Sequence, residues 1–198
     1  MIIRNNVKGK LIIFSAPSGS GKTTIVKHLL SKKLKLEFSI SATSRPARVN
    51  ETHAKDYYFL SASEFKAKIA ANEFLEWEEV YPDRFYGTLK SEVERIRSTG
   101  HHVIFDVDVV GGCSIKEYYG AEALAIFVQP PSVEELKRRL EKRSTDAPDV
   151  IATRVQKAEY ELSFAPRFDV ILINDVLEDA FEKAEELVNE FLGTGSEN

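Results

Sequence analysis

The sequence LIIFSAPSGSGKTT, residues 11–24, decides the fold of this chain. Its first four residues are an apolar run that predicts a buried β-strand, and residues 25–30 carry apolar side chains at helical spacing. Between them lies a loop of glycine and serine that ends in Lys22 and Thr23. Strand, phosphate-binding loop and helix therefore follow one another in the order that the G-x-x-x-x-G-K-[ST] pattern requires.

This loop has the chemistry needed to hold a nucleoside triphosphate. Gly19 and Gly21 lack a Cβ and tolerate positive φ, so several backbone N–H groups can approach one anion. The helix that follows directs the positive end of its dipole at the same place. We expect Lys22 to reach the β and γ phosphates and Thr23 to ligate Mg²⁺. The expected triphosphate-binding residues of the loop are Ala16, Pro17, Ser18, Gly19, Ser20, Gly21, Lys22, Thr23 and Thr24.

The motif departs from its pattern at the first position, where Ala16 replaces glycine. A residue at the start of the loop with negative φ can be alanine, so the departure is tolerable. The alternative interpretation is an ordinary glycine and serine turn with an exposed lysine. The buried-type strand before the loop and the apolar-periodic helix after it favour the phosphate loop.

Length and composition set limits on the rest. A chain of 198 residues can form one α/β domain and bury about 70% of its unfolded surface. Its net charge of −4 provides no basic surface for a nucleic acid. Cys113 is the only cysteine, which excludes a disulfide framework and suits a reducing cytoplasm. No apolar run reaches the ~18 residues of a membrane span, and no signal-peptide pattern is present at the start.

Strands and helices are expected to alternate along most of the chain, which predicts an α/β fold with a doubly wound parallel sheet flanked by helices. The expected single domain, 1–198, has a core of residues 1–37 and 98–198 and an inserted mixed α/β lobe of residues 38–97. Expected core strands are 11–14, 103–108, 123–128 and 170–173, with helices at 133–142, 149–164 and 177–192. Expected lobe strands are 57–60, 73–80 and 85–88, with helices from Ser61 or Ser63 to 69 and at 90–98. A polar loop is expected at 42–56, and Trp77 is expected in the core of the lobe.

Two acidic residues, Asp106 and Asp108, end an apolar strand that should lie beside the strand of the phosphate loop. Period-two alternation predicts that both carboxylates share one face, where Asp106 could hold Mg²⁺ as a Walker B acid does. An apolar strand ending in aspartate is weak by itself. The phosphate loop gives the pattern its functional interpretation.

Arginines gather in the stretch 138–154, at Arg138, Arg139, Arg143 and Arg154. Arg139 and Arg143 are four apart and share a helical face. Phosphoryl transfer needs charge neutralisation around the transferred group, which guanidinium groups supply. The alternative is a solvated helix whose arginines pair with neighbouring glutamates.

The lobe carries a third cluster of residues that could bind an acceptor. Two arginines and two phenols can hold a monophosphate, and a carboxylate with a hydroxyl can read the edge of a base. Each of these residues could also be purely structural, and their shared lobe favours binding. The cluster is Ser41, Arg45, Arg48, Tyr57, Glu76, Tyr86 and Thr88.

An ordered series of motifs resembles the guanylate kinase family from about residue 10 to about residue 188. The motifs are SAPSGSGKTT, SISATSRPARVNETHAKDYYF, EFLEW, FYGT, VIFDVDVVGG, PPSVEELKRRLEKR and ILIND. The resemblance implies ATP-dependent phosphorylation of GMP, with dGMP as an expected second acceptor and Mg²⁺ as cofactor. It also implies a role in purine nucleotide metabolism. Together with the composition, this leads us to expect a cytoplasmic protein with no obligate protein partner, no nucleic acid and no membrane.

The resemblance also implies roles for single residues. Ser41 and Glu76 would read guanine, and Arg45, Arg48, Tyr57 and Tyr86 would hold the GMP phosphate. Gly87 and Thr88 would line that pocket, with Asp108 on the GMP side. Lys22, Arg45, Arg139, Arg143 and Arg154 would be catalytic, the last three from a lid at about 139–154. Asn174 and Asp175 would contact the adenine of ATP, and Thr23 and Asp106 would hold the metal.

Two other classes of function are alternatives. One is a catalytically inactive guanylate-kinase-like interaction module, and the other is a kinase or ATP hydrolase that acts on another small phosphorylated acceptor. Intact Lys22 and Thr23 and the arginines of the lid disfavour the first. Ala16, Asn50, Ala54 and Val110 depart from the residues common in the family, and none would be a charged contact.

Overall fold

The computed structural model describes residues 8–143 and 148–194, and only the backbone of Arg143, Pro148 and Asp149. The chain divides into two compact units. The first, here called the insert unit, comprises Met1–Lys10 and Glu37–Val103. The second, the core unit, comprises Leu11–Leu36 and Ile104–Asn198.

The expected helices and strands are present in their expected order. The structure adds strands at Leu36–Phe38 and Ala42–Thr43 and a helix at Val109–Tyr119, which were not predicted, and two short 3-10 turns at Gly120–Glu122 and Ala165–Arg167. In chain order the elements are β1 (Leu11–Ser15), α1 (Lys22–Leu30), β2 (Leu36–Phe38), β3 (Ala42–Thr43), β4 (Tyr58–Phe59), α2 (Ala62–Ala70), β5 (Phe74–Tyr81), β6 (Arg84–Leu89), α3 (Lys90–Ser98), β7 (His102–Asp106), α4 (Val109–Tyr119), β8 (Ala123–Gln129), α5 (Val133–Arg143), α6 (Pro148–Leu162), β9 (Val170–Ile173) and α7 (Leu177–Leu192).

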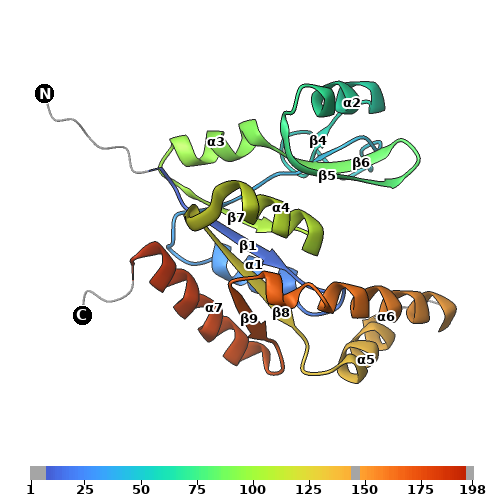
Figure 1. Ribbon diagram of the computed structural model, residues 1–198, viewed down its shortest axis with the longest axis vertical. Coiled ribbons are helices and arrows are strands. Elements are labelled where there is room, and N and C mark those ends of the chain that lie inside the picture. Colours follow the sequence, from blue (N-terminus) through green and yellow to red (C-terminus); the bar gives the residue numbers. More distant parts are fainter. Residues whose placement is uncertain (1–7, 144–147, 195–198) are drawn as a thin grey trace, which may run out of the picture. The chain divides into compact units, whose positions relative to one another are not determined.

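The central sheet has the strand order β2-β7-β1-β8-β9. Its strands β7, β1, β8 and β9 are labelled in Figure 1. Strands β1 and β8 pair in parallel with Ile13 opposite Ala125, and β8 and β9 pair in parallel with Val128 opposite Leu172. All five residues of β1 are buried, as a strand covered on both faces requires. The expected α/β core with a parallel sheet is confirmed.

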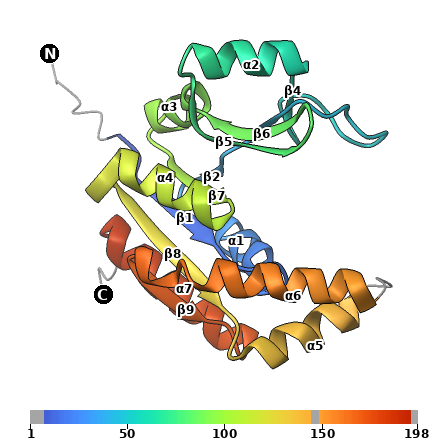
Figure 2. The same ribbon diagram turned by 45° about the vertical axis from the view of Figure 1, so that its right-hand side comes forward.

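Side chains alternate between the two faces of each strand. In the core unit, helices cover the apolar side chains that the strands present. Ile12 and Phe14 of β1 join one apolar cluster with Leu29 of α1 and Ala184 of α7. Helix α4 packs against β1 and β8. Helices α5 and α6 lie side by side (Figure 2) and share a separate small cluster that includes Leu136. The core unit therefore places the start of α1 close after the carboxyl end of a fully buried strand.

The insert unit is built on a second sheet with the strand order β4-β3-β6-β5. Helix α2 covers it through Phe65, whose ring stacks on Phe74 and Phe85. Ser61 is the N-cap of α2 and forms a capping box with Glu64, which settles the choice between two candidate serines. The lobe helix 90–98 is confirmed as α3.

Three local expectations are wrong. The strand expected at 103–108 ends at Asp106, and Asp108 instead caps α4 by accepting the N–H of Gly111 at 2.7 Å. The two aspartates therefore do not share a strand face. Trp77, expected in the lobe core, is 47% exposed because the second half of β5 is open to solvent.

Ala42 lies in a stretch expected to be a polar loop, yet it begins β3. Strand β3 exists because it pairs with β4 on one side and with β6 on the other, so long-range pairing overrides a weak local pattern. Within residues 8–143 and 148–194, no helix has both the length and the apolar character needed to cross a membrane.

Candidate active site

The phosphate loop of the core unit is fixed by a residue distant in sequence. Gly21 is the N-cap of α1 with φ of 90°, and Gly19 has φ of 93°. The side-chain amide of Asn174 donates to the carbonyl of Ser20 at 2.7 Å, and a Cβ on Gly21 would collide with that amide. Ala16 is buried and is not among the positive-φ residues, as expected for an alanine at this point.

Lys22 and Thr23 converge on the end of the neighbouring strand. The Lys22 ammonium lies 2.7 Å from a carboxylate oxygen of Asp106 and donates to the carbonyl of Val107 at 2.6 Å. The Thr23 hydroxyl donates to the other oxygen of Asp106 at 2.7 Å. These groups border a cavity of about 390 Å³ that the phosphate loop, Asp108 and Glu161 also line.

The donor set suits a magnesium ion held mainly by phosphate oxygens. Among the described residues, no group of three or more His, Cys, Asp or Glu side chains is placed to hold a metal. Magnesium in phosphoryl-transfer sites needs only one or two protein oxygens, because the substrate supplies the others. The adjacent oxygens of Thr23 and Asp106 fit that requirement.

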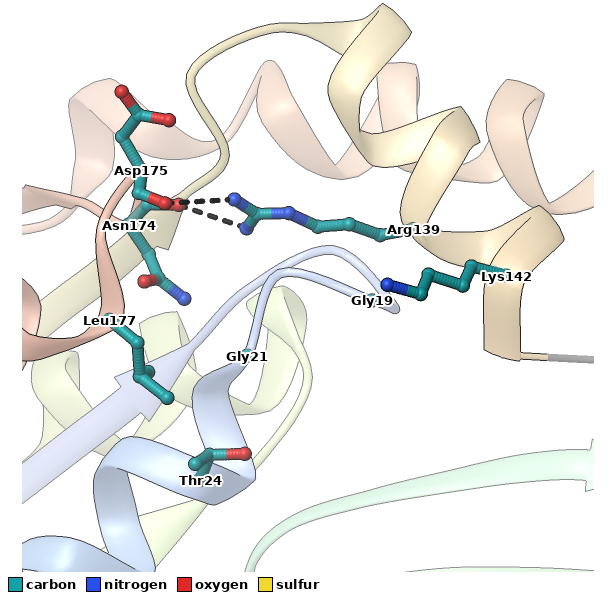
Figure 3. A pocket seen from close by; sticks show the side chains of 8 residues that line it. All are labelled: Gly19, Gly21, Thr24, Arg139, Lys142, Asn174, Asp175 and Leu177. Atoms are coloured by element: carbon teal, nitrogen blue, oxygen red, sulfur yellow. Dashed lines mark hydrogen bonds between the residues drawn. The ribbon is translucent and has the colours of Figure 1, made fainter.

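A second cavity of about 430 Å³ lies on another side of the loop (Figure 3). Arg139 reaches across it from α5 and donates to the backbone carbonyls of Asn174 at 2.9 Å and Asp175 at 3.2 Å. Figure 3 shows Lys142 extending from the same helix toward the loop at Gly19. The cavity volume lies in the range of small-molecule sites, and its cations suit an anionic ligand.

For four of the predicted ATP-site and lid residues, the motifs did not indicate how the side chains would lie. Asn174 is buried, with its amide committed to the phosphate loop, and the carboxylate of Asp175 points away from Arg139 (Figure 3). Arg154 lies on an exposed part of α6. The side chain of Arg143 lies outside the described part of the chain.

The insert unit brings the predicted phosphate-binding side chains together. The Nε of Arg45 donates to the Tyr86 hydroxyl at 3.1 Å, and its guanidinium carbon lies 4.9 Å from the centre of the Tyr57 ring. Both terminal nitrogens of Arg45 bind the carboxylate of Glu51. Arg48 is exposed, and its backbone N–H donates to the same carboxylate at 2.8 Å.

The predicted base-reading residues also lie within this unit. Strand pairing sets Glu76 opposite Thr88, whose hydroxyl donates to the Glu76 carboxylate at 2.5 Å. A Cβ on Gly87 would collide with the Glu76 carbonyl, so glycine permits this close approach. Ser41 is half-buried, and its carbonyl accepts the N–H of Tyr58 at 2.9 Å.

Three residues of these sites were not predicted from the sequence: Lys142, Glu161 and Glu51. Lys142 lies three residues after Arg139, so helical spacing could have suggested it. Glu161 falls three residues after buried Ala158 on α6, which makes it a carboxylate on an apolar face. Glu51 gave no signal, because its partners depend on how the loop folds.

Glu161 is only 6% exposed, and its Oε2 atom has no hydrogen-bond partner among the described residues. Burial raises the pKa of this carboxyl, while its backbone hydrogen bond from Ser18 and the charges of Lys157 and Lys22 oppose that shift. A carboxyl whose pKa is higher in the folded than in the unfolded state binds more protons in the folded state. The folded state therefore loses stability as the pH rises above the pKa of the carboxyl in the unfolded chain.

We expect Glu161→Gln to raise the melting temperature at pH 8 by roughly 2–4 °C, the shift that about 1 kcal/mol produces in a chain of this size. At pH 4 the difference should vanish, because both states are then largely protonated. Thermal unfolding of both proteins across this range measures it. Glu159→Gln, an exposed change on the same helix, is the control. A shift that is equal at both pH values would contradict the ionisation argument.

The core unit has the fold and site of a P-loop kinase, with a phosphate loop between β1 and α1 and an acid at the end of β7. The chain belongs to the guanylate kinase family, whose model, described as Guanylate kinase, matches residues 8–191. Members of this family are phosphotransferases, and this chain is an enzyme of that class.

Relatives agree over nearly the whole chain. It is 62% identical over 190 residues to a guanylate kinase of Bacteroides fragilis, covering 96% of this chain and 93% of the relative. It is 55% identical over 184 residues to one of Porphyromonas gingivalis, covering 92% and 98%. The crystal structure of guanylate kinase from Anaplasma phagocytophilum matches with a TM-score of 0.70 and 25% identity, covering 94% and 87%.

Proposed function

We propose that this protein transfers the terminal phosphoryl group of ATP to GMP, giving ADP and GDP. The observation that carries the proposal is near full-length identity with guanylate kinases, at 62% in one relative. The side chains gathered at the phosphate loop of the core unit and those gathered around Arg45 in the insert unit support it. A role in purine nucleotide metabolism belongs to the same proposal, and so does the cytoplasm, which suits a single buried thiol at Cys113.

In the donor site, the backbone N–H groups of the loop and the ammonium of Lys22 bind and orient the phosphates of ATP. Thr23 and Asp106 would hold Mg²⁺, which when bound neutralises charge on the phosphates. Arg139 and Lys142 add positive charge beside the loop. We propose that the cavity of Arg139 and Asn174 takes the adenosine part of ATP, whose phosphates would meet the cations beside the loop, and that Asn174 acts by fixing the loop.

Residues 139–154 are proposed as a lid that carries Arg139, Arg143 and Arg154. These guanidinium groups would neutralise charge on the transferred phosphoryl group and help exclude water. Arg139 supports this role because it already lies beside the phosphate loop. The roles of Arg143 and Arg154 rest on the family pattern.

The insert unit is proposed as the acceptor lobe. Arg45, Arg48, Tyr57 and Tyr86 would hold the GMP phosphate, with charge-assisted hydrogen bonds from the arginines. The carboxylate of Glu76, aligned by Thr88, would accept the N1–H and N2–H₂ donors of guanine, with Ser41 beside them, and Gly87 would allow close approach. The role of Asp108 toward GMP stays a prediction, since its carboxylate caps α4.

A coupled assay with GMP, dGMP, AMP, UMP and CMP as acceptors tests this function. We expect turnover with GMP and dGMP and little with the other three. A chain that consumed ATP without transferring it, or that preferred another acceptor, would contradict the proposal. No observation favours the interaction module, which would bind ligands without turnover.

Glu76→Gln is expected to lower kcat/KM for GMP by about 10- to 100-fold, because an amide donor then faces the guanine donors in place of an acceptor (~1–3 kcal/mol). The preference for GMP over AMP should narrow accordingly. Steady-state assays with both acceptors measure this. Glu78→Gln, an exposed change on the same strand, should leave the preference intact. An unchanged GMP/AMP ratio in Glu76→Gln would remove Glu76 from base recognition.

A further inference from the structure

The guanidinium of Arg45 is held by a carboxylate from its own loop. Nη1 of Arg45 lies 2.6 Å from one oxygen of Glu51, and Nη2 lies 2.7 Å from the other. This is the bidentate geometry in which arginine binds carboxylates and phosphates. The Arg45 side chain is 11% exposed and that of Glu51 17% exposed, so the pair lies mostly out of solvent.

The other contacts of Arg45 leave it little freedom. Nε donates to the Tyr86 hydroxyl at 3.1 Å, and Nη1 donates a second time, to the carbonyl of Pro46 at 3.0 Å. The guanidinium also lies against the rings of Tyr57 and Phe59, at 4.9 and 5.6 Å from their centres. Within the described part of the chain, these partners occupy the Nε hydrogen, both Nη1 hydrogens and one of the two on Nη2.

We propose that Glu51 is a positioning residue for the acceptor site: it holds Arg45 in one orientation, with the remaining Nη2 hydrogen and the neighbouring phenols available to the phosphate of the acceptor. This inference rests on the proposed phosphorylation of GMP. It adds a residue that would not touch the substrate and would act through Arg45.

Two physical arguments support positioning. A free arginine side chain must be ordered when it binds an anion, and the lost freedom weakens binding, whereas a side chain already fixed avoids most of that loss. The same Glu51 carboxylate also accepts the backbone N–H of Arg48 at 2.8 Å, so it sets the loop between the two arginines.

Glu51 stays charged at neutral pH. Its hydrogen bonds from Arg45 and from the Arg48 backbone lower the pKa of the carboxyl to about 2. A negative charge beside an anion site would repel the phosphate if charge alone mattered. Competition between Glu51 and the phosphate therefore predicts that its removal improves binding, while positioning predicts that its removal weakens binding.

Glu51→Gln separates these outcomes, because glutamine keeps the size of the side chain and loses its charge. We expect KM for GMP to rise about tenfold, the effect of freeing one long side chain. KM for ATP should stay within about twofold, and kcat should change less than KM for GMP. Glu73→Gln removes an exposed, paired carboxylate from the same unit and should change neither constant.

Guanosine supplies the second readout, because it lacks the phosphate that Arg45 is proposed to hold. The inhibition constant of guanosine should be the same in the parent protein and in Glu51→Gln. General damage to the insert unit would instead weaken the binding of both guanosine and GMP. Glu51→Asp, which retains the charge, should recover part of the lost affinity for GMP.

A lower or unchanged KM for GMP in Glu51→Gln would overturn the positioning role. A loss of guanosine binding as large as the loss of GMP binding would overturn it too. Should Glu51→Gln fail to fold, the comparison of Glu51→Asp with the parent protein decides by the same two constants. Absence of GMP turnover in the parent protein is a different result, which overturns the proposed function itself.

Discussion

Lys22→Met is expected to lower kcat/KM for ATP and GMP by about two to three orders of magnitude, the usual loss when one preorganised charge at a transferred group is removed. The ammonium of Lys22 lies at the phosphate loop, held by Asp106 and by the carbonyl of Val107. Methionine preserves much of the volume and removes the charge. Initial rates with each substrate varied in turn measure the loss.

The fold should survive this change, because Asp106 keeps its hydrogen bond from Thr23. Lys27→Met, an exposed substitution on the same helix, is the matched control and should keep normal turnover. Circular dichroism and melting curves check that all three proteins are folded. A folded Lys22→Met protein with activity within threefold of the parent would show that Lys22 does not have the proposed role at the ATP phosphates.

Arg45→Met is expected to reduce kcat/KM for GMP by about 10²- to 10³-fold while leaving ATP binding unchanged. The change removes charge-assisted hydrogen bonds to the acceptor phosphate. It also leaves the carboxylate of Glu51 without its cationic partner, so a negative charge that was paired now repels the phosphate. Loss of the cation and exposure of an anion act in the same direction.

Arg45→Lys sharpens the test, because it keeps the charge and removes the planar fork. Its activity should fall between those of the parent protein and Arg45→Met. Arg84→Met, an exposed change in β6 of the same unit, should behave like the parent. ATP affinity, followed separately by calorimetry, should agree among all four proteins. Normal GMP turnover by folded Arg45→Met would remove Arg45 from the acceptor site.

Much of the fold followed from patterns that are local in sequence. The strand before the phosphate loop, the helix after it and the strand at Val170–Ile173 were all predicted from runs of apolar residues. The capping box at Ser61 and Glu64 needs only residues three apart. Such features depend on periodicity, capping and turn chemistry, so the order of residues determines them directly.

The same locality explains the errors. Alternation along an apolar run predicted one face for Asp106 and Asp108, but the strand ended and Asp108 became a helix cap. Trp77 was expected in the core because of its residue type, yet the second half of β5 is open to solvent. A strand's length and its cover depend on partners elsewhere in the chain.

The residues of the phosphate loop, the candidate acceptor residues and the family were readable from the sequence by itself. Only the tertiary structure decided that Asn174 supports the loop from 154 positions away, that Glu161 is buried behind it, and that Glu51 occupies both terminal nitrogens of Arg45. These are contacts between side chains whose backbones are brought together by sheet pairing and loop closure, and no local pattern encodes the distance between them.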